Sequence, residues 1–251
     1  MTEISIRAEK IFEIAGWPVT NAVLLSLAAL AVLVLIAIAI RRNLEMIPGK
    51  LQSVFELLLE EILKIMDAVL GSRHLSEKYL PIVAAIFLFI LTSNWLGLLP
   101  IIGPIGITER AASHSGGDVF IPLFRSPASD LNFTIALAVI SVFSVNFLGI
   151  AAIGFGRHFG KFFNFKNPIL SFTGLLEFIS EFVKIISYSF RLFGNVFAGE
   201  VLLVIVGSLV PYILPLPFIF LEIFVGFIQA SIFAILTLVF IAMAVSEEPA
   251  H

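Results

Sequence analysis

Six ionisable residues interrupt the last two long apolar segments of the chain. They are Glu177, Glu181, Lys184, Arg191, Glu200 and Glu222. An ionisable side chain placed in hydrocarbon costs about 2.5–3.5 kcal/mol on insertion scales, so such residues normally face water or a protein partner. Carboxylates exchange protons with water, whereas an arginine keeps its charge near neutral pH. The residue types therefore suit proton transfer controlled by a fixed positive charge.

The spacing places these residues on two faces of one helix. Six polar residues follow one another at intervals of three or four positions, which forms a single stripe. They are Glu177, Glu181, Lys184, Tyr188, Arg191 and Asn195. Glu200 falls on the opposite side of the same helix, at 100° of rotation per residue.

The next apolar segment adds Glu222 and Gln229, which share one face. The connection SLVPYILPLP makes the two segments antiparallel neighbours. Pairing Arg191 with Gln229 and Glu200 with Glu222 then fits one register.

This register predicts two separate acidic approaches. Glu177 and Glu181 lie toward one membrane surface, Glu200 and Glu222 toward the other, and Arg191 between them. A continuous acidic path would leak protons, and an arginine interrupts it.

Several blander interpretations stay open. Lys184 could neutralise Glu181 three residues earlier, or extend to the interface. Glu177 or Glu181 could be an interfacial residue without a role. Asn195 and Gln229 could simply join two helices by a hydrogen bond.

The composition indicates a lipid environment for the elements that carry these residues. Of the 251 residues, 59% are hydrophobic and 13% charged, with a mean hydropathy of +1.08. Soluble domains are near 45–50% apolar and about 25% charged. The net charge of −3 gives no reason to expect a nucleic-acid partner, and the lack of cysteine excludes disulfides and thiolate metal sites. The mixed charges of the first residues do not resemble a cleavable signal, so we expect the first apolar segment to be a retained span.

Five apolar segments predict an all-α polytopic membrane protein forming a single domain, 1–251. After an outer N-terminal segment (1–20), three segments match the roughly 20 residues that a span requires: 21–40, 80–99 and 131–155. The segments 169–208 and 216–245 are too long for one upright span, and we expect long, strongly tilted helices.

Two connections have distinct characters. Residues 48–71 repeat apolar positions at helical spacing opposite acidic ones, which predicts an interfacial amphipathic helix. The outer loop 100–130 is rich in Gly, Pro and Ser and is predicted to be irregular. His114 in this loop is more simply a solvated side chain than a metal ligand.

Lysine and arginine are distributed asymmetrically over the connections. Nine fall in the two connections 41–79 and 156–168, against four on the other side: Arg7, Lys10, Arg110 and Arg125. The positive-inside rule then predicts an outer N-terminus and an inner C-terminus.

Four stretches resemble subunit a of the F-type ATP synthase. They are RLFGNVFAGE at 191–200, SNWLGLLP at 93–100, SPASDLNFT at 126–134 and FIQASIFAILTLVFIAMA at 227–244. The similarity extends over about residues 45–248. It implies that Arg191 is the essential arginine facing a ring of c subunits, each with one carboxylate in the membrane. The resemblance also implies an inner half-channel position for Glu177. It assigns four further residues to the outer half-channel or to the surroundings of the arginine: Asn195, Glu200, Glu222 and Gln229.

One departure concerns Glu200 and Glu222. Many bacterial members carry histidine at the position of Glu222, and mitochondrial members often carry histidine at that of Glu200. This chain has a carboxylate at both positions and no imidazole. We therefore expect the protonation of Glu200 and that of Glu222 to be coupled. No role for Glu181 follows from the resemblance, and its position on the stripe alone places it in the pathway.

The expected function is that of a proton-translocating stator subunit without a catalytic site, cofactor or metal of its own. The implied partners are the c ring, the b subunits, the rest of the ATP synthase and the lipid bilayer. A bacterial inner membrane is favoured over a mitochondrial one. The alternative is a secondary ion or anion transporter using Arg191, which should show a repeated half or paired broken helices.

Overall fold

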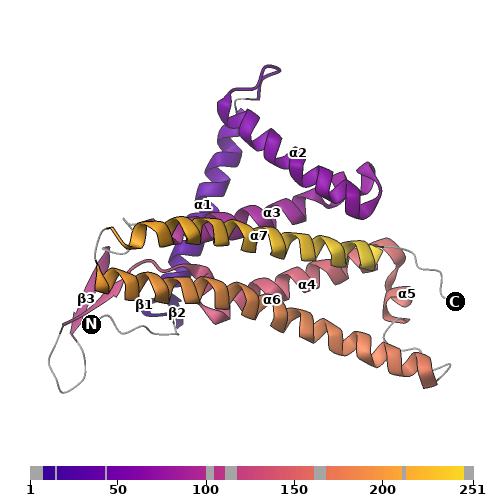
Figure 1. Ribbon diagram of the computed structural model, residues 1–251. Helices are drawn as coiled ribbons and strands as arrows, with labels where there is room; N and C mark the ends of the chain where they lie inside the picture. The colour runs from indigo at the N-terminus through magenta and orange to yellow at the C-terminus, as the bar shows by residue number, and fades with distance from the viewer. Residues whose placement is uncertain are drawn as a thin grey trace. The chain divides into compact units, whose positions relative to one another are not determined.

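The predicted helical membrane architecture is confirmed. The computed structural model describes residues 8–14, 16–42, 44–99, 105–110, 118–160, 168–210 and 213–245. Five helices are long and apolar enough to cross a membrane (Figure 1): α1 (Asn21–Arg42), α3 (Arg73–Gly97), α4 (Leu131–Ile153), α6 (Pro168–Leu209) and α7 (Pro215–Val245). The remaining elements are α2 (Lys50–Leu70), α5 (Phe155–Gly160), the 3₁₀ turn η1 (Pro127–Ser129) and four short strands. The expectation for His114 lies outside the described residues.

The two longest segments are single continuous helices. α6 has 42 residues and α7 has 31. Each begins at a proline, Pro168 or Pro215, whose missing N–H is tolerated in a first turn. At 1.5 Å per residue, α6 is about 60 Å long, twice the thickness of the hydrocarbon layer. Its tilt in the membrane remains a prediction.

Two predicted span boundaries differ from the helices. α3 begins at Arg73, before the expected residue 80, and continues through Pro81. α4 ends at Ile153, two residues earlier than expected, because Gly154 adopts a left-handed conformation (φ 86°). The short helix α5 follows directly.

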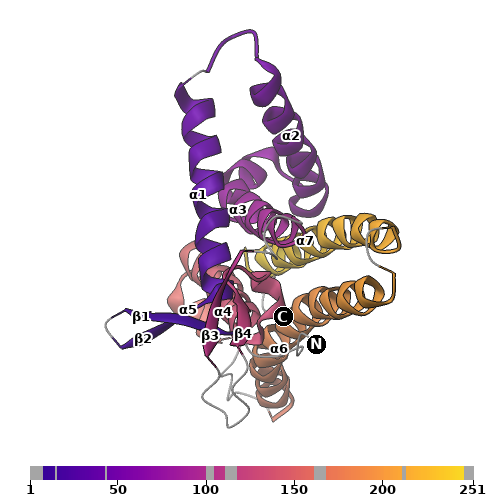
Figure 2. The same cartoon turned by 90° about the vertical axis from the view of Figure 1, so that its left-hand side faces the viewer.

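The outer loop was wrongly predicted to be irregular throughout. β3 (Gly106–Arg110) and β4 (Asp118–Pro122) pair antiparallel, with Thr108 opposite Phe120. The stretches GITER and DVFIP contain strand-forming residues, but the surrounding Gly, Pro and Ser obscured them. A second hairpin, β1 (Lys10–Ile14) with β2 (Trp17–Thr20), lies in the N-terminal segment (Figure 2).

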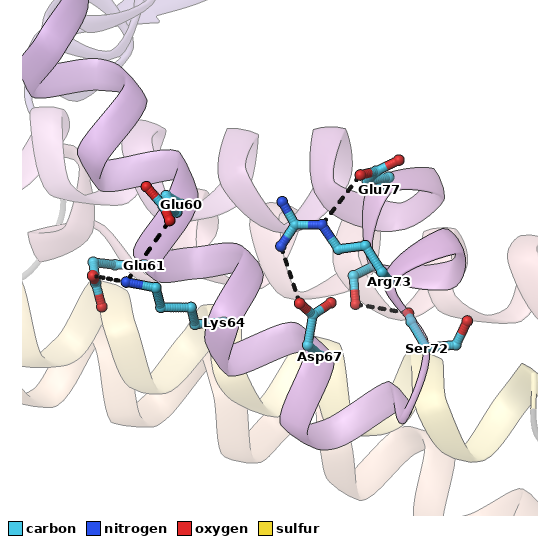
Figure 3. Close-up of polar contacts among 8 residues, drawn as sticks. Glu60, Glu61, Lys64, Asp67, Ser72, Arg73 and Glu77 are labelled. Atoms are coloured by element: carbon cyan, nitrogen blue, oxygen red, sulfur yellow. Dashed lines mark hydrogen bonds and ion pairs between the residues drawn. The ribbon is translucent and has the colours of Figure 1, made fainter.

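The amphipathic helix is present as α2. It ends at Gly71, whose left-handed conformation (φ 67°) lets its N–H donate to the carbonyl of Asp67 at 2.9 Å. The chain then turns into α3, where Arg73 bonds the carboxylates of Asp67 at 3.0 Å and Glu77 at 3.1 Å (Figure 3). These contacts fix the corner between the two helices.

The chain divides into two compact units, which are described separately. The first unit comprises Met1–Met46, Leu88–Thr134 and Arg191–Ala230. In it, α3 is joined to α7 by hydrogen bonds from Asn94 to the carbonyl of Gly226 (3.4 Å) and from Trp95 to the carbonyl of Ile223 (3.1 Å).

The second unit comprises Ile47–Phe87, Ile135–Phe190 and Ser231–His251. Ser141 of α4 and Thr237 of α7 share a buried hydrogen bond of 2.9 Å. The Tyr188 ring of α6 packs on Phe233 of α7, with ring centroids 4.7 Å apart. Hydrogen bonds therefore hold α7 against neighbouring helices in both units, and aromatic packing adds to them in the second.

Candidate functional site

Asn195 and Gln229 form the central polar contact between α6 and α7 in the first unit. The Asn195 amide donates to Oε1 of Gln229 at 2.7 Å, and Gln229 is only 1% exposed. The expected register paired Gln229 with Arg191, so the amide contact is about one helical turn further along α6. Among the described residues, Nε2 of Gln229 is a buried donor without a hydrogen-bond partner.

Glu222 of α7 reaches α6 at the residue preceding Glu200. The Glu222 residue is 8% exposed, and a methyl group added to Gly199 would lie 1.5 Å from its Oε1. The carboxylate therefore occupies the space that the missing side chain of Gly199 leaves free. Together with the amide contact, this places the α6 and α7 parts of the first unit antiparallel, as expected from the sequence.

Glu200 contacts Arg125, a cation that sequence reasoning did not single out as a site residue. Nε of Arg125 lies 3.1 Å from Oε1 of Glu200, and also 3.1 Å from the hydroxyl of Ser129. The Arg125 side chain is 9% exposed and that of Glu200 34% exposed. Arg125 appeared in sequence only as one of the loop cations. The adjacent motif SPASDLNFT was the one available signal of its importance.

The second unit contains a different acidic cluster. Glu181 accepts hydrogen bonds from Lys184 at 2.5 Å and from Asn146 of α4 at 3.1 Å. The ammonium group of Lys184 also lies 4.3 Å from the centre of the Phe240 ring. Lys184 thus neutralises Glu181, which is one of the alternatives left open by the sequence. Glu177, one turn earlier on α6, is exposed.

Arg191 is exposed on α6. Phe190 beside it and Ile186 a little over one turn earlier are also exposed. An arginine on a surface this apolar is costly in contact with lipid. The surroundings therefore favour a protein partner that covers this part of α6.

The fold and these clusters define a polytopic α-helical membrane protein with ion pairs and amide contacts inside its apolar segments. The family ATP synthase A chain matches residues 22–242, and the chain belongs to this family. Membership makes it a membrane subunit of the ATP synthase complex, without a catalytic site of its own. The resemblance found in the sequence is confirmed.

Relatives cover most of the chain. It is 34% identical over 221 residues to ATP synthase subunit a of Campylobacter jejuni subsp. jejuni (strain 81-176), with 87% of each chain covered. It is 35% identical over 227 residues to the subunit a of Campylobacter fetus, with 90% of each covered. For the subunit a of Helicobacter acinonychis the values are 33% over 217 residues and 86% of each. These bacterial relatives and the five apolar helices support an integral bacterial membrane protein.

Proposed function

We propose that the chain carries protons through the membrane sector by two offset half-channels, and that Arg191 couples this flow to rotation of a c ring. One observation carries the proposal. Arg191 is exposed on α6 next to the exposed Phe190, and the same continuous helix carries Glu181 ten residues before it and Glu200 nine residues after it.

The outer half-channel is assigned to the cluster in the first unit. Protons enter past Glu222 and Glu200, and Asn195 and Gln229 line the approach to Arg191. Glu200 suits this role because its side chain is 34% exposed, so water can reach it. A proton then neutralises the carboxylate of one c subunit. The neutral carboxyl group can enter lipid at a far lower free-energy cost than the charged carboxylate.

The inner half-channel is assigned to Glu177 and Glu181. A c-subunit carboxylate that arrives there after nearly a full turn loses its proton to the inner side. The positive charge of Arg191 favours the ionised carboxylate and prevents the proton from returning directly. Each charge crossing 100 mV supplies about 2.3 kcal/mol, so several protons are needed for one ATP.

The partners follow from this role. The c ring covers the exposed face around Arg191, and the b subunits hold the chain stationary. The N-terminus is placed outside and the C-terminus inside, because the basic connections lie on the inner side.

The test is proton-driven ATP synthesis by the purified complex in lipid vesicles. Arg191→Ala should abolish synthesis, and Arg191→Lys should leave less than a tenth of the rate because lysine lacks the planar fork and can lose its proton. Arg73→Ala is the matched control, since it removes an exposed arginine from the α2–α3 corner. Undiminished synthesis by Arg191→Ala, in complexes that assemble normally, would contradict the proposal.

A further inference from the structure

Arg125 contacts the carboxylate of Glu200 through two of its guanidinium nitrogens. Nε lies 3.1 Å from Oε1, and both Nε and Nη2 donate to Oε2 at 3.4 Å. A guanidinium in this arrangement fixes the plane of a carboxylate as well as its position. Because Arg125 is 9% exposed and Glu200 34% exposed, the cation is shielded while the carboxylate still meets solvent.

The segment that carries Arg125 is itself held by hydrogen bonds. The Ser129 hydroxyl accepts from Nε of Arg125 at 3.1 Å and donates to the carbonyl of Ser126 at 2.8 Å. Pro127, Ala128 and Ser129 are buried. A buried turn held by these hydrogen bonds is a firm support for a side chain that must orient another.

A second carboxylate, that of Glu9, acts on the same cation. Burial raises the pKa of Glu9, and the nearby charge of Arg125 acts in the opposite direction. Among the described residues, Oε2 of Glu9 is buried without a hydrogen-bond partner. The Glu9 carbonyl accepts the Asn21 N–H at 3.1 Å, and the Asn21 side chain donates to the carbonyl of Pro122 at 3.3 Å. These bonds tie the N-terminal segment to the segment that carries Arg125.

We propose that Arg125 is a positioning residue of the outer proton pathway, holding the Glu200 carboxylate in the orientation in which it exchanges protons. The inference rests on the proposed function. The contact of two guanidinium nitrogens with the carboxylate restricts the rotation of Glu200, and the solvent exposure of Glu200 leaves it able to gain and lose a proton. Three segments distant in sequence meet here: the N-terminal segment braces the segment before α4, and the guanidinium of that segment pairs with the carboxylate on α6.

The experiment compares Arg125→Gln, Arg125→Lys and Glu200→Gln in the complete complex reconstituted in vesicles. ATP synthesis is measured per assembled complex against the proton concentration of the outer side. Arg73→Gln is the matched control, because Arg73 also lies between two carboxylates. We expect Arg125→Gln to lower the maximal rate at least tenfold and to change the half-maximal outer proton concentration at least threefold. Arg125→Lys, which keeps the charge, should return that concentration to within twofold of the parent value.

Three results would overturn the inference while the proposed function stands. In each, Glu200→Gln is inactive. The first is an Arg125→Gln complex that keeps at least half of the parent rate. The second is an unchanged half-maximal proton concentration despite a lower rate. The third is failure of both Arg125 variants to assemble, which would show a purely structural clamp. A Glu200→Gln complex with the parent rate would instead contradict the proposed outer half-channel itself.

Discussion

The Glu222 carboxylate packs directly against the backbone of Gly199. A methyl group in place of the Gly199 hydrogen would lie 1.5 Å from Oε1 and 2.1 Å from the carboxyl carbon of Glu222. No contact that close is sterically possible, so any side chain at position 199 would push the Glu222 carboxylate away from its present place on α6. The same contact sets the level at which Glu222 meets the residue before Glu200.

Gly199→Ala should therefore displace Glu222 and slow ATP synthesis by about tenfold or more. Alanine is otherwise favoured over glycine in a helix by roughly 0.5–1 kcal/mol, so helix stability does not oppose the change. Gly207→Ala is the control, because a methyl group at Gly207 of the same helix meets only Cγ of Pro215, at an ordinary contact distance of 3.9 Å. The two variants are compared by the rate per assembled complex. Equal rates for both would show that the position of Glu222 does not matter.

The Asn195–Gln229 hydrogen bond should be measurable as a coupling energy. Removing Asn195 leaves the buried Oε1 of Gln229 without its donor, which costs about 1–3 kcal/mol. We expect Asn195→Ala and Gln229→Leu together to destabilise the detergent-solubilised protein by about 1 kcal/mol less than the sum of the single changes. The measurement is the free energy of unfolding in a double-mutant cycle.

A second cycle serves as the control for this coupling. Ser208 is on the same helix and donates to the carbonyl of Ile205 within that helix. Asn195→Ala and Ser208→Ala should show no coupling. Additive effects of Asn195 and Gln229 would mean that the 2.7 Å contact contributes nothing to stability.

The α2–α3 corner should lose stability in acid. A hydrogen bond with Ser76 and, next, the bond and charge of Arg73 hold the pKa of the Asp67 carboxylate below its usual value of 3.8. A lowered pKa stabilises the folded corner above pH 3.8, and this contribution disappears as the pH falls through the folded pKa. Hydrogen-exchange protection of the Gly71 amide, which donates to the Asp67 carbonyl, should fall in this range after correction for intrinsic rates. Asp67→Asn should make the protection independent of pH there, and an unchanged profile in that variant would contradict the assignment.

The sequence was most informative about the helices. Long apolar segments set the spans, and helical spacing revealed α2 and the polar stripe on α6. The antiparallel pairing of α6 and α7 was predictable because both carry polar residues near one level. The pairing of Gln229 with Asn195, one turn away from the expected Arg191, was not predictable. The register depends on how side chains such as Glu222 fill the space at Gly199.

The contacts of Arg125 could not be predicted from the sequence, for a different reason. Arg125 and Glu200 are 75 positions apart, and their contact depends on the fold of an outer segment that was predicted to be irregular. Its hairpin, β3 with β4, gave only a weak sequence signal. Lys184 and Glu181 are three residues apart on one helix, so their pairing could be anticipated. Local spacing predicted local contacts, whereas long-range ion pairs required the structure.

Thiol accessibility from each side of the membrane tests whether Arg191 separates two half-channels that open to opposite sides. The chain has no cysteine, so single cysteines can be introduced at Glu177, Glu181, Arg191, Glu200 and Glu222 without background. Membrane-impermeant thiol reagents are then added to either face of vesicles that contain the assembled complex. We expect labelling at 200 and 222 only from the outer face, and at 177 and 181 only from the inner face. Labelling of both pairs from one face would show a continuous aqueous path past Arg191 and would contradict two separate half-channels.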